Sequence, residues 1–208
     1  YRGSYAKRAK QVRAAAYAIS DKLRRERAAA DKARTLAIQT DIIDRENRIS
    51  TLERDTIYGE KGVLNTSHGR ESQGMPASAL DEYTKQIDLI GVGIATDEGK
   101  VLYARMRQNR IESVGRDLNN HASREAQKYV AGELTAKTQN GIHEAARAAV
   151  TPDQLGNIDP ARGAAILADL DNTITTLGPT AGLTPTEIEG EIRKAHTLTH
   201  ETIITALT

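Results

Sequence analysis

A proline-free stretch from Thr96 to Ala149 constrains the fold of this chain more than any other feature. It opens with Thr96, Asp97 and Glu98, a hydroxyl cap and two acids, which the first turn of a helix favours. Apolar residues then recur at steps of mostly three or four and so share one helical stripe: Leu102, Met106, Ile111, Val114, Leu118, Ala122, Ala126, Val130 and Leu134. An unbroken helix of this length would measure about 80 Å, so we expect a rod or one arm of a long bundle.

A second long helix is expected from about Ser4 to Ile57, where the sequence has neither proline nor glycine. Its apolar residues follow a seven-residue repeat that Glu26 interrupts: Val12, Ala16, Ile19, Leu23, Ala30, Ala33 and Ala37. The phase then changes and continues with Ile38, Ile42, Ile49 and Leu52. This alanine-rich seam lets partner helices approach closely but is too poor in leucine and isoleucine for a stable isolated coiled coil. We therefore expect it to pack against other helices.

Glycine and proline separate the remaining elements. Four glycines between Tyr58 and Pro76 predict a loop of defined shape: Gly59, Gly62, Gly69 and Gly74. A shorter helix is expected to begin at Ala77 or Ser78 and to end at Gly91 and Gly93.

Three more helices are expected after Ala149, because a capping residue precedes proline at Thr151-Pro152, Asp159-Pro160 and Thr184-Pro185. The third is a full capping box, which Glu187 completes. No stretch shows the sustained alternation of apolar and polar residues that a strand requires. The fold class is therefore predicted to be all-α, with more than about two-thirds of the residues helical, where globular proteins average about one-third.

We predict long antiparallel helices that form an elongated helical bundle, with a Gly-rich loop and shorter C-terminal helices. Three parts are expected: a long basic N-terminal helix at 1–57, the Gly-rich loop with a short and a long central helix at 58–149, and shorter capped helices at 150–208. The sequence begins with Tyr1 rather than Met, and it stops at Thr208 inside an apparent helix. We therefore expect a piece of a longer protein whose last part continues beyond the given chain.

The amino-acid composition limits the kinds of hydrophobic core and functional site that this chain can form. It has no Cys, Trp or Phe, and only 3% of its residues are aromatic. A core built from Ala, Ile, Leu and Val suits thin helical layers, since compact cores draw much of their buried area from aromatic residues. The lack of cysteine excludes a disulfide framework and a thiolate metal site or nucleophile. The sequence contains no run of about 18 apolar residues, which is the length that would indicate a transmembrane helix.

Basic residues are concentrated near the N-terminus, although the formal net charge of the chain is only +1. Residues 1–35 contain eleven Lys and Arg against three acids, a net +8, and the remainder carries 18 against 25, a net −7. This asymmetry indicates a basic arm that contacts phosphate or another acidic surface. We favour the alternatives, a solvated face or pairing with the acidic part of a neighbouring subunit, because a run of charges is weak evidence without aromatic interleaving. Phosphate, DNA or subunit contacts are predicted at Lys7, Arg8, Lys10, Arg13, Lys22, Arg24, Arg25 and Arg27.

Two short motifs have the residue types of a functional site. Glu71-Ser72 superficially resembles the catalytic acid of lytic transglycosylases, which needs a raised pKa in a sugar-binding cleft. The Gly-Leu-Met-Gln stretch of that family is absent, so we interpret Glu71 as a loop residue. His196 and His200 have a spacing that can bind Zn²⁺, but a zincin would need Glu where Thr197 stands, and no third ligand is evident. We expect these histidines to make polar packing or interface contacts.

The other histidines are expected to have structural roles. His121 and His143 stand alone on expected helices and are predicted to be surface or packing residues, and His68 is expected to form a hydrogen bond within its loop. No Ser-His-Asp grouping, phosphate-cradling loop or dinucleotide fingerprint is present. The sequence therefore predicts no catalytic residue, no cofactor and no metal.

The segment from Tyr58 to Ala149, together with the last helix, resembles a known family. It contains a loop and two helical sequences, GVLNTSHGRESQG, ALDEYTKQIDLI and ATDEGKVLYARMRQNRIESVGRDLNNHASREAQKY, and the later TPTEIEGEIRKAHTLTHETIITAL fits the same pattern. These helices and small residues are similar to helical internal virion (DNA ejection) proteins of tailed bacteriophages. Residues 1–57 match only in being long and helical.

The resemblance implies a protein stored in the virion interior near the portal and released into the host envelope, the periplasm, with or before the DNA. The partners it implies are further copies in a ring or tube, portal or further ejection proteins, DNA through non-specific contact, and the host envelope after ejection. Some family members carry a peptidoglycan-degrading domain elsewhere in long chains. This segment shows no such site, so no enzymatic activity is carried over.

We therefore expect a structural protein that assembles near the portal, or into a channel across the host envelope, to assist genome delivery. It should not be a stable monomer, since two long, thinly hydrophobic helices cannot both be covered by their own chain. The alternatives are a sequence-independent nucleic-acid-binding helical module and part of a peptidoglycan-degrading virion enzyme that uses Glu71. The first alternative is compatible with the leading one, because a tube that conducts DNA meets phosphate.

Overall fold

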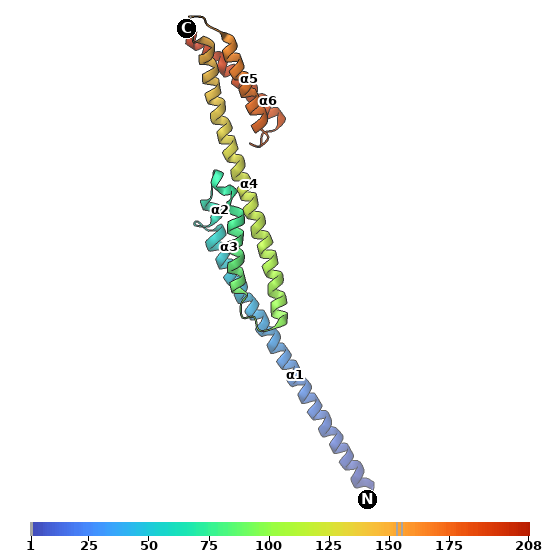
Figure 1. Cartoon of the computed structure of the whole chain (residues 1–208). Helices are drawn as coiled ribbons and strands as arrows, with labels where there is room; N and C mark the ends of the chain where they lie inside the picture. The colour runs from blue at the N-terminus through green and yellow to red at the C-terminus, as the bar shows by residue number, and fades with distance from the viewer. Residues whose placement is uncertain (1, 153, 155) are drawn as a thin grey trace. The chain divides into compact units, whose positions relative to one another are not determined.

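The computed structural model describes residues 2–152, 154 and 156–208, with the side chains of residues 2–6 outside the description. It is 86% helical, and no described residue lies in a strand. The predictions of an all-α fold and of more than two-thirds helix are therefore confirmed. The elements, shown in Figure 1, are α1 (Arg2–Glu53), the π-helical turn η1 (Arg54–Tyr58), α2 (Val63–Thr66), the 3₁₀ turn η2 (Gly69–Gln73), α3 (Met75–Ile90), α4 (Asp97–Val150), α5 (Pro160–Leu177) and α6 (Pro185–Leu207).

The chain forms two compact units. Unit 1 comprises Tyr1–Gly62 and Asp81–Ser113, and unit 2 comprises Val63–Leu80 and Val114–Thr208. Helices α3 and α4 contribute residues to both units. None of the described helices combines the length and the apolarity that crossing a membrane requires.

Of the described side chains of α1, those in the C-terminal part of the helix belong to the core of unit 1. Burial in α1 begins at Ile38, which is 7% exposed, and Ile49 is fully buried. Ile38 is also the residue at which the apolar repeat of the sequence changes phase. The phase change therefore separates the part of α1 that packs within its own chain from the part before it.

A buried polar network joins three helices of unit 1. The Tyr83 hydroxyl of α3 donates to Glu53 Oε1 of α1 at 2.7 Å, and Arg110 Nη1 of α4 donates to Glu53 Oε2 at 3.2 Å. Arg110 Nη2 also donates to Glu46 Oε1 at 3.1 Å. Burial of the phenol and its bond to the Glu53 carboxylate raise the pKa of Tyr83. A buried carboxylate is tolerated because both of its oxygens are satisfied.

Removing the Tyr83 hydroxyl should weaken unit 1 measurably. We expect Tyr83→Phe to lower the free energy of unfolding by about 1.5–3 kcal/mol, because a buried carboxylate loses one of its donors. Tyr17→Phe is the matched control, since Tyr17 is 77% exposed and its change should stay within about 0.5 kcal/mol. Urea unfolding followed by circular dichroism measures both. Equal stability of the two variants would contradict the role of the network.

The Arg45 side chain caps the C-terminal end of α3. Its Nη1 donates to the carbonyl oxygens of Ile90 and of Val92, the latter at 3.1 Å, and its Nε donates to Asp41 Oδ2 at 3.1 Å. Arg45 is only 8% exposed. The guanidinium thus satisfies carbonyls that a helix end leaves without intrahelical donors.

In unit 2, α5 and α6 pack against the C-terminal part of α4. The buried residues of this cluster are Leu134, Ile142, Ala145, Leu167, Leu170, Ile174 and Ala195. Small residues bring α5 close to α4: a Cβ on Gly163 would lie 2.7 Å from the Ala145 carbonyl oxygen and 2.7 Å from Ala149 Cβ. Gly163 is therefore required by the spacing of two backbones.

The close approach predicts opposite effects for the same substitution on two helices. Gly163→Ala should lower the melting temperature of the protein, because the overpacking cost of about 1–3 kcal/mol exceeds the gain in helix propensity. Gly190→Ala on α6 is the matched control, since a Cβ there meets nothing within 4 Å and should stabilise by about 0.5–1 kcal/mol. Thermal unfolding compares them. A Gly163→Ala protein that is as stable as Gly190→Ala would refute the steric argument.

Several predicted helix ends are confirmed. Thr96 Oγ1 accepts from the Gly99 amide at 3.1 Å at the start of α4. Asp159 Oδ1 accepts from the Ala161 amide at 3.0 Å at the start of α5. Thr184 and Glu187 form the expected capping box of α6.

The helix predicted to start at Thr151-Pro152 is wrong. Thr151, Pro152 and Gln154 are not helical, while residues 153 and 155 lie outside the described part of the chain. The Thr151 amide donates to the Arg147 carbonyl at 3.0 Å, so Thr151 ends α4 instead of capping a new helix. Gly156 then has a φ of +84°, which no helix continues through.

The Gly-rich segment also differs in detail from the prediction. It contains the short helical turns η1, α2 and η2, and α3 begins at Met75, before the predicted Ala77 or Ser78. Gly69 has a φ of +56°. This left-handed conformation is available to glycine at no steric cost, and it lets the chain turn back at the start of η2.

Candidate functional site

The N-terminal part of α1 is a free-standing basic helix within unit 1. Residues 7–37 are all exposed, and Figure 1 shows this part of the helix in blue, away from the other helices of its unit. The structure places every predicted contact residue on this exposed stretch: Lys7, Arg8, Lys10, Arg13, Lys22, Arg24, Arg25 and Arg27. Whether they contact phosphate or another subunit stays a prediction. Arg2, which the sequence analysis counted in the basic arm, has its side chain outside the described residues.

The exposed helix has two different faces. At about 100° per residue, Val12, Ile19 and Leu23 lie within about 40° of one another. They are 68%, 61% and 50% exposed. A shallow groove runs along this stripe between Ala16 and Leu23 and is bordered by Arg27. We call the apolar residues of the heptad repeat, Val12, Ala16, Ile19, Leu23, Ala30, Ala33 and Ala37, the α1 seam.

The opposite half of the helix carries much of the positive charge. The same spacing places Lys10, Arg13 and Arg24 away from the α1 seam, together with Tyr17. Tyr17 is 77% exposed and lies one turn from Arg13, so an aromatic ring does stand among the cations. The sequence already carries this signal, because Tyr17 stands between Arg13 and Lys22 along the chain. We call this half the basic face.

Some of these cations have ion-pair partners on the same helix. Arg25 lies 2.7 Å from Asp21, and Lys22 lies 3.9 Å from Glu26. Pairs this exposed contribute little stability and exchange readily with other anions. The cluster from Lys7 to Arg13 has no acid among its neighbours in the sequence up to Asp21. Its charge is therefore available to a partner.

A second group of chemically active side chains lies in unit 2, where the Gly-rich segment meets α4. His68, His121 and Glu125 each offer a ligand atom within 4.8 Å of the others. The rings of His68 and His121 have centroids 6.4 Å apart, and His68 Nδ1 lies 3.7 Å from Glu125 Oε2. We call these three residues the loop cluster.

Glu125 is the buried member of the loop cluster, at 7% exposure. Its Oε1 accepts from Lys128 Nζ at 2.7 Å, and its Oε2 accepts from the Gly69 amide at 3.1 Å. These two hydrogen bonds, the one to Lys128 foremost, lower the pKa of Glu125 from 4.5 to about 2. The carboxylate is therefore ionised at neutral pH.

The sequence analysis predicted no metal site and treated His121 as an isolated residue. The structure brings it together with His68 and Glu125. The predicted hydrogen bond of His68 within its loop is confirmed, since Nε2 donates to the Asn65 carbonyl at 3.1 Å. The signal available in the sequence was the spacing of His121 and Glu125, four apart and thus on one face of a helix.

The remaining candidate motifs occupy structural positions. Glu71 is exposed, and the neighbouring Ser72 is buried with its Oγ donating to the Gly69 carbonyl at 2.7 Å. His196 Nε2 lies 2.9 Å from Asp171 Oδ2 and links α6 to α5, which supports its interpretation as a packing contact. His200 is exposed.

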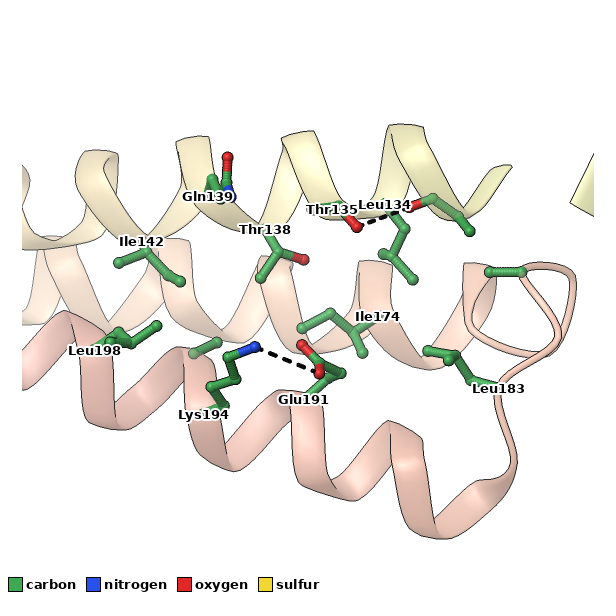
Figure 2. A pocket seen from close by; sticks show the side chains of 13 residues that line it. Leu134, Thr135, Thr138, Gln139, Ile142, Ile174, Leu183, Glu191, Lys194 and Leu198 are labelled. Carbon is green, nitrogen blue, oxygen red and sulfur yellow. Dashed lines mark hydrogen bonds and ion pairs between the residues drawn. The ribbon is translucent and has the colours of Figure 1, made fainter. Parts of the chain in front are cut away.

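A pocket of about 270 Å³ lies among α4, α5 and α6 in unit 2. Figure 2 shows that Leu134 and Ile142 reach into it from α4, opposite Ile174 of α5, with Lys194 and Glu191 of α6 paired at 3.7 Å. The volume is just under the range of about 300–1,000 Å³ that small-molecule sites occupy. Four of its lining residues, Leu134, Ile142, Ile174 and Ala195, belong to the core cluster of unit 2, so we interpret it as a gap in the packing of these helices.

Comparison with protein-family models, with curated proteins and with solved structures finds no match for this chain. The function is therefore proposed from the residues and the geometry of the chain, together with the resemblance found in its sequence.

Proposed function

We propose that the protein is a structural assembly protein whose copies associate through the α1 seam. The observation that carries this proposal is the complete exposure of residues 7–37 on a helix with an apolar heptad stripe. Helices in proteins gain most of their stability from packing an apolar face, and this stretch packs on no other described element. A partner that covers the stripe would supply the missing stabilisation.

A second copy of the chain is the partner that best fits this surface. The heptad spacing is a pattern by which helices pack against other helices, and its alanines permit a close approach. The charge distribution favours the same partner, because the +8 of residues 1–35 complements the −7 of the remainder. A contact between different surfaces of successive copies closes into a ring or continues as a tube.

The biological setting we propose follows from the resemblance to tailed-phage ejection proteins. In that setting the protein is held in the virion interior near the portal, beside portal or further ejection proteins, and enters the host envelope and periplasm to assist genome delivery. A helical chain with few aromatic residues suits passage through a narrow tail, since little buried area must be exposed for it to unfold. We assign this segment no enzymatic role.

The mass of the assembled protein tests the proposal. Light scattering on the purified chain should give a whole-number multiple of the mass of one chain, and electron microscopy should show closed rings or tubes of uniform diameter. A single-chain mass at every concentration up to the millimolar range would overturn the proposal. Irregular aggregates without a defined number of copies would overturn the ring or tube.

The basic face supports a second function, sequence-independent contact with nucleic acid. Cations bind phosphates without reading bases, and an exposed aromatic ring can stack on a base of any kind. Lys10, Arg13, Arg24 and Tyr17 share the half of α1 that lies away from the α1 seam. One helix could therefore bind a second copy on one side and phosphate on the other.

A further inference from the structure

We propose that the loop cluster binds one divalent metal ion of the zinc class through His68, His121 and Glu125. Two imidazoles and a carboxylate form a donor set that Zn²⁺ prefers. The three ligand atoms already lie within 4.8 Å of one another. They come from two segments of unit 2: His68 immediately precedes η2, and His121 and Glu125 lie on α4.

Both histidines are held in the tautomer that leaves Nδ1 free to coordinate. His68 Nε2 lies 3.1 Å from the Asn65 carbonyl oxygen, and His121 Nε2 lies 2.8 Å from the Ser67 carbonyl oxygen. A carbonyl oxygen only accepts hydrogen bonds, so each Nε2 carries a proton, and in the neutral imidazole that coordinates a metal the lone pair is on Nδ1. Metal-binding histidines characteristically donate their other N–H to a carbonyl or carboxylate in this way.

The carboxylate of Glu125 is also prepared for coordination. Oε1 is taken by Lys128, whereas Oε2 faces His68 Nδ1 at 3.7 Å and accepts from the Gly69 amide. Metal-binding carboxylates commonly keep such a second hydrogen bond. Lys128 has a side chain that is 73% exposed, so it can remain on Oε1 or turn into solvent when a cation binds.

Closing the site requires a small movement that the structure allows. Around a tetrahedral zinc ion, ligand atoms lie about 3.4 Å apart, so the widest separation of the present ligand atoms must shorten by up to about 1.4 Å. His68 is exposed and belongs to a loop, whereas Glu125 is buried on α4. We therefore expect His68 to be the ligand that moves when the site closes around the ion. Three protein ligands leave a fourth position for water or for a donor from a partner.

A bound metal ion would link the Gly-rich segment to α4 through its ligands. Among the links that the described residues already make between them are the His121–Ser67 and Glu125–Gly69 hydrogen bonds. A coordinated ion adds bonds among the same residues that exist only in the folded state, so binding should raise the stability of unit 2.

The test uses the full chain without a polyhistidine tag, stripped of metal by a chelator and titrated calorimetrically with zinc chloride. We expect saturation at one Zn²⁺ per chain and a rise in melting temperature. His68→Ala should weaken binding by at least about tenfold while leaving the helix content unchanged, because His68 is exposed. Glu125→Gln should also weaken binding.

Two matched variants make the outcome decisive. His143→Ala removes an exposed histidine from the same helix α4, and His200→Ala removes one member of the other histidine pair. Both should bind Zn²⁺ like the parent chain. Absence of saturable binding, or binding that survives His68→Ala and Glu125→Gln and is lost in His200→Ala, would overturn the proposal.

Discussion

Replacing Ile19 and Leu23 together with glutamate is expected to leave the protein as folded single chains. Both residues lie at the centre of the α1 seam and are exposed in the single chain. Burying one such side chain in an interface contributes about 1.5–3 kcal/mol, so the double variant forfeits about 3–6 kcal/mol per seam. This corresponds to about 10²–10⁴-fold weaker association. Sedimentation velocity over a concentration series measures the shift.

The control places the same two charges on the other side of the helix. Ala14 and Ala28 are exposed and lie opposite the α1 seam, so Ala14→Glu with Ala28→Glu should assemble like the parent chain. Circular dichroism should report the same helix content for both double variants, because residues 7–37 support no part of the described core. If the seam variant assembles as strongly as the control, the α1 seam is not the subunit contact.

Reversing the charge of Lys7, Arg8, Lys10 and Arg13 is expected to reduce binding to duplex DNA of any sequence. Each phosphate that a cation neutralises releases counterions and adds about 0.9 to the slope of log affinity against log salt. Removing four such contacts should lower the slope by about 3–4 and cost about a hundredfold in affinity at moderate salt. Fluorescence anisotropy at several salt concentrations, with two unrelated DNA sequences, measures both quantities.

The second cluster provides an internal comparison. Lys22, Arg24, Arg25 and Arg27 include two residues already paired with Asp21 and Glu26, so their reversal should reduce the slope less. Helix content should not change in either variant. If the reversals abolish assembly and leave DNA affinity unchanged, the cations are subunit contacts, and the nucleic-acid role of α1 is wrong.

Local chemistry made most of the helix ends predictable. The hydroxyl of Thr96 and the Thr184-Glu187 pair act within one turn of the chain, so the sequence contains all the atoms that matter. The prediction of a helix start at Thr151-Pro152 was wrong for an equally local reason, because the Thr151 amide remains hydrogen-bonded within α4. A capping pattern alone does not show whether the preceding helix has already ended.

The sites that depend on distant parts of the chain were not predictable. The contact of His121 with the Ser67 carbonyl joins residues 54 positions apart, and it follows from the left-handed turn at Gly69 and the packing of the loop on α4. Arg45 was missed for a similar reason, because its partners are backbone carbonyls at the end of another helix. Side-chain types reveal such contacts only when the fold is known.

In the assembly that we propose, the change of phase at Ile38 separates the residues of α1 that fold the chain from those that join its copies. The buried residues Ile38 and Ile49 lie about a quarter turn around α1 from Val12 and Leu23, so the chain completes its own core without using the α1 seam. An alanine-rich seam binds weakly per residue, and mass action then decides how much of it is occupied. Dilute chains would remain separate while they are made and transported. The same chains, confined together in a small volume, would join without any chemical trigger.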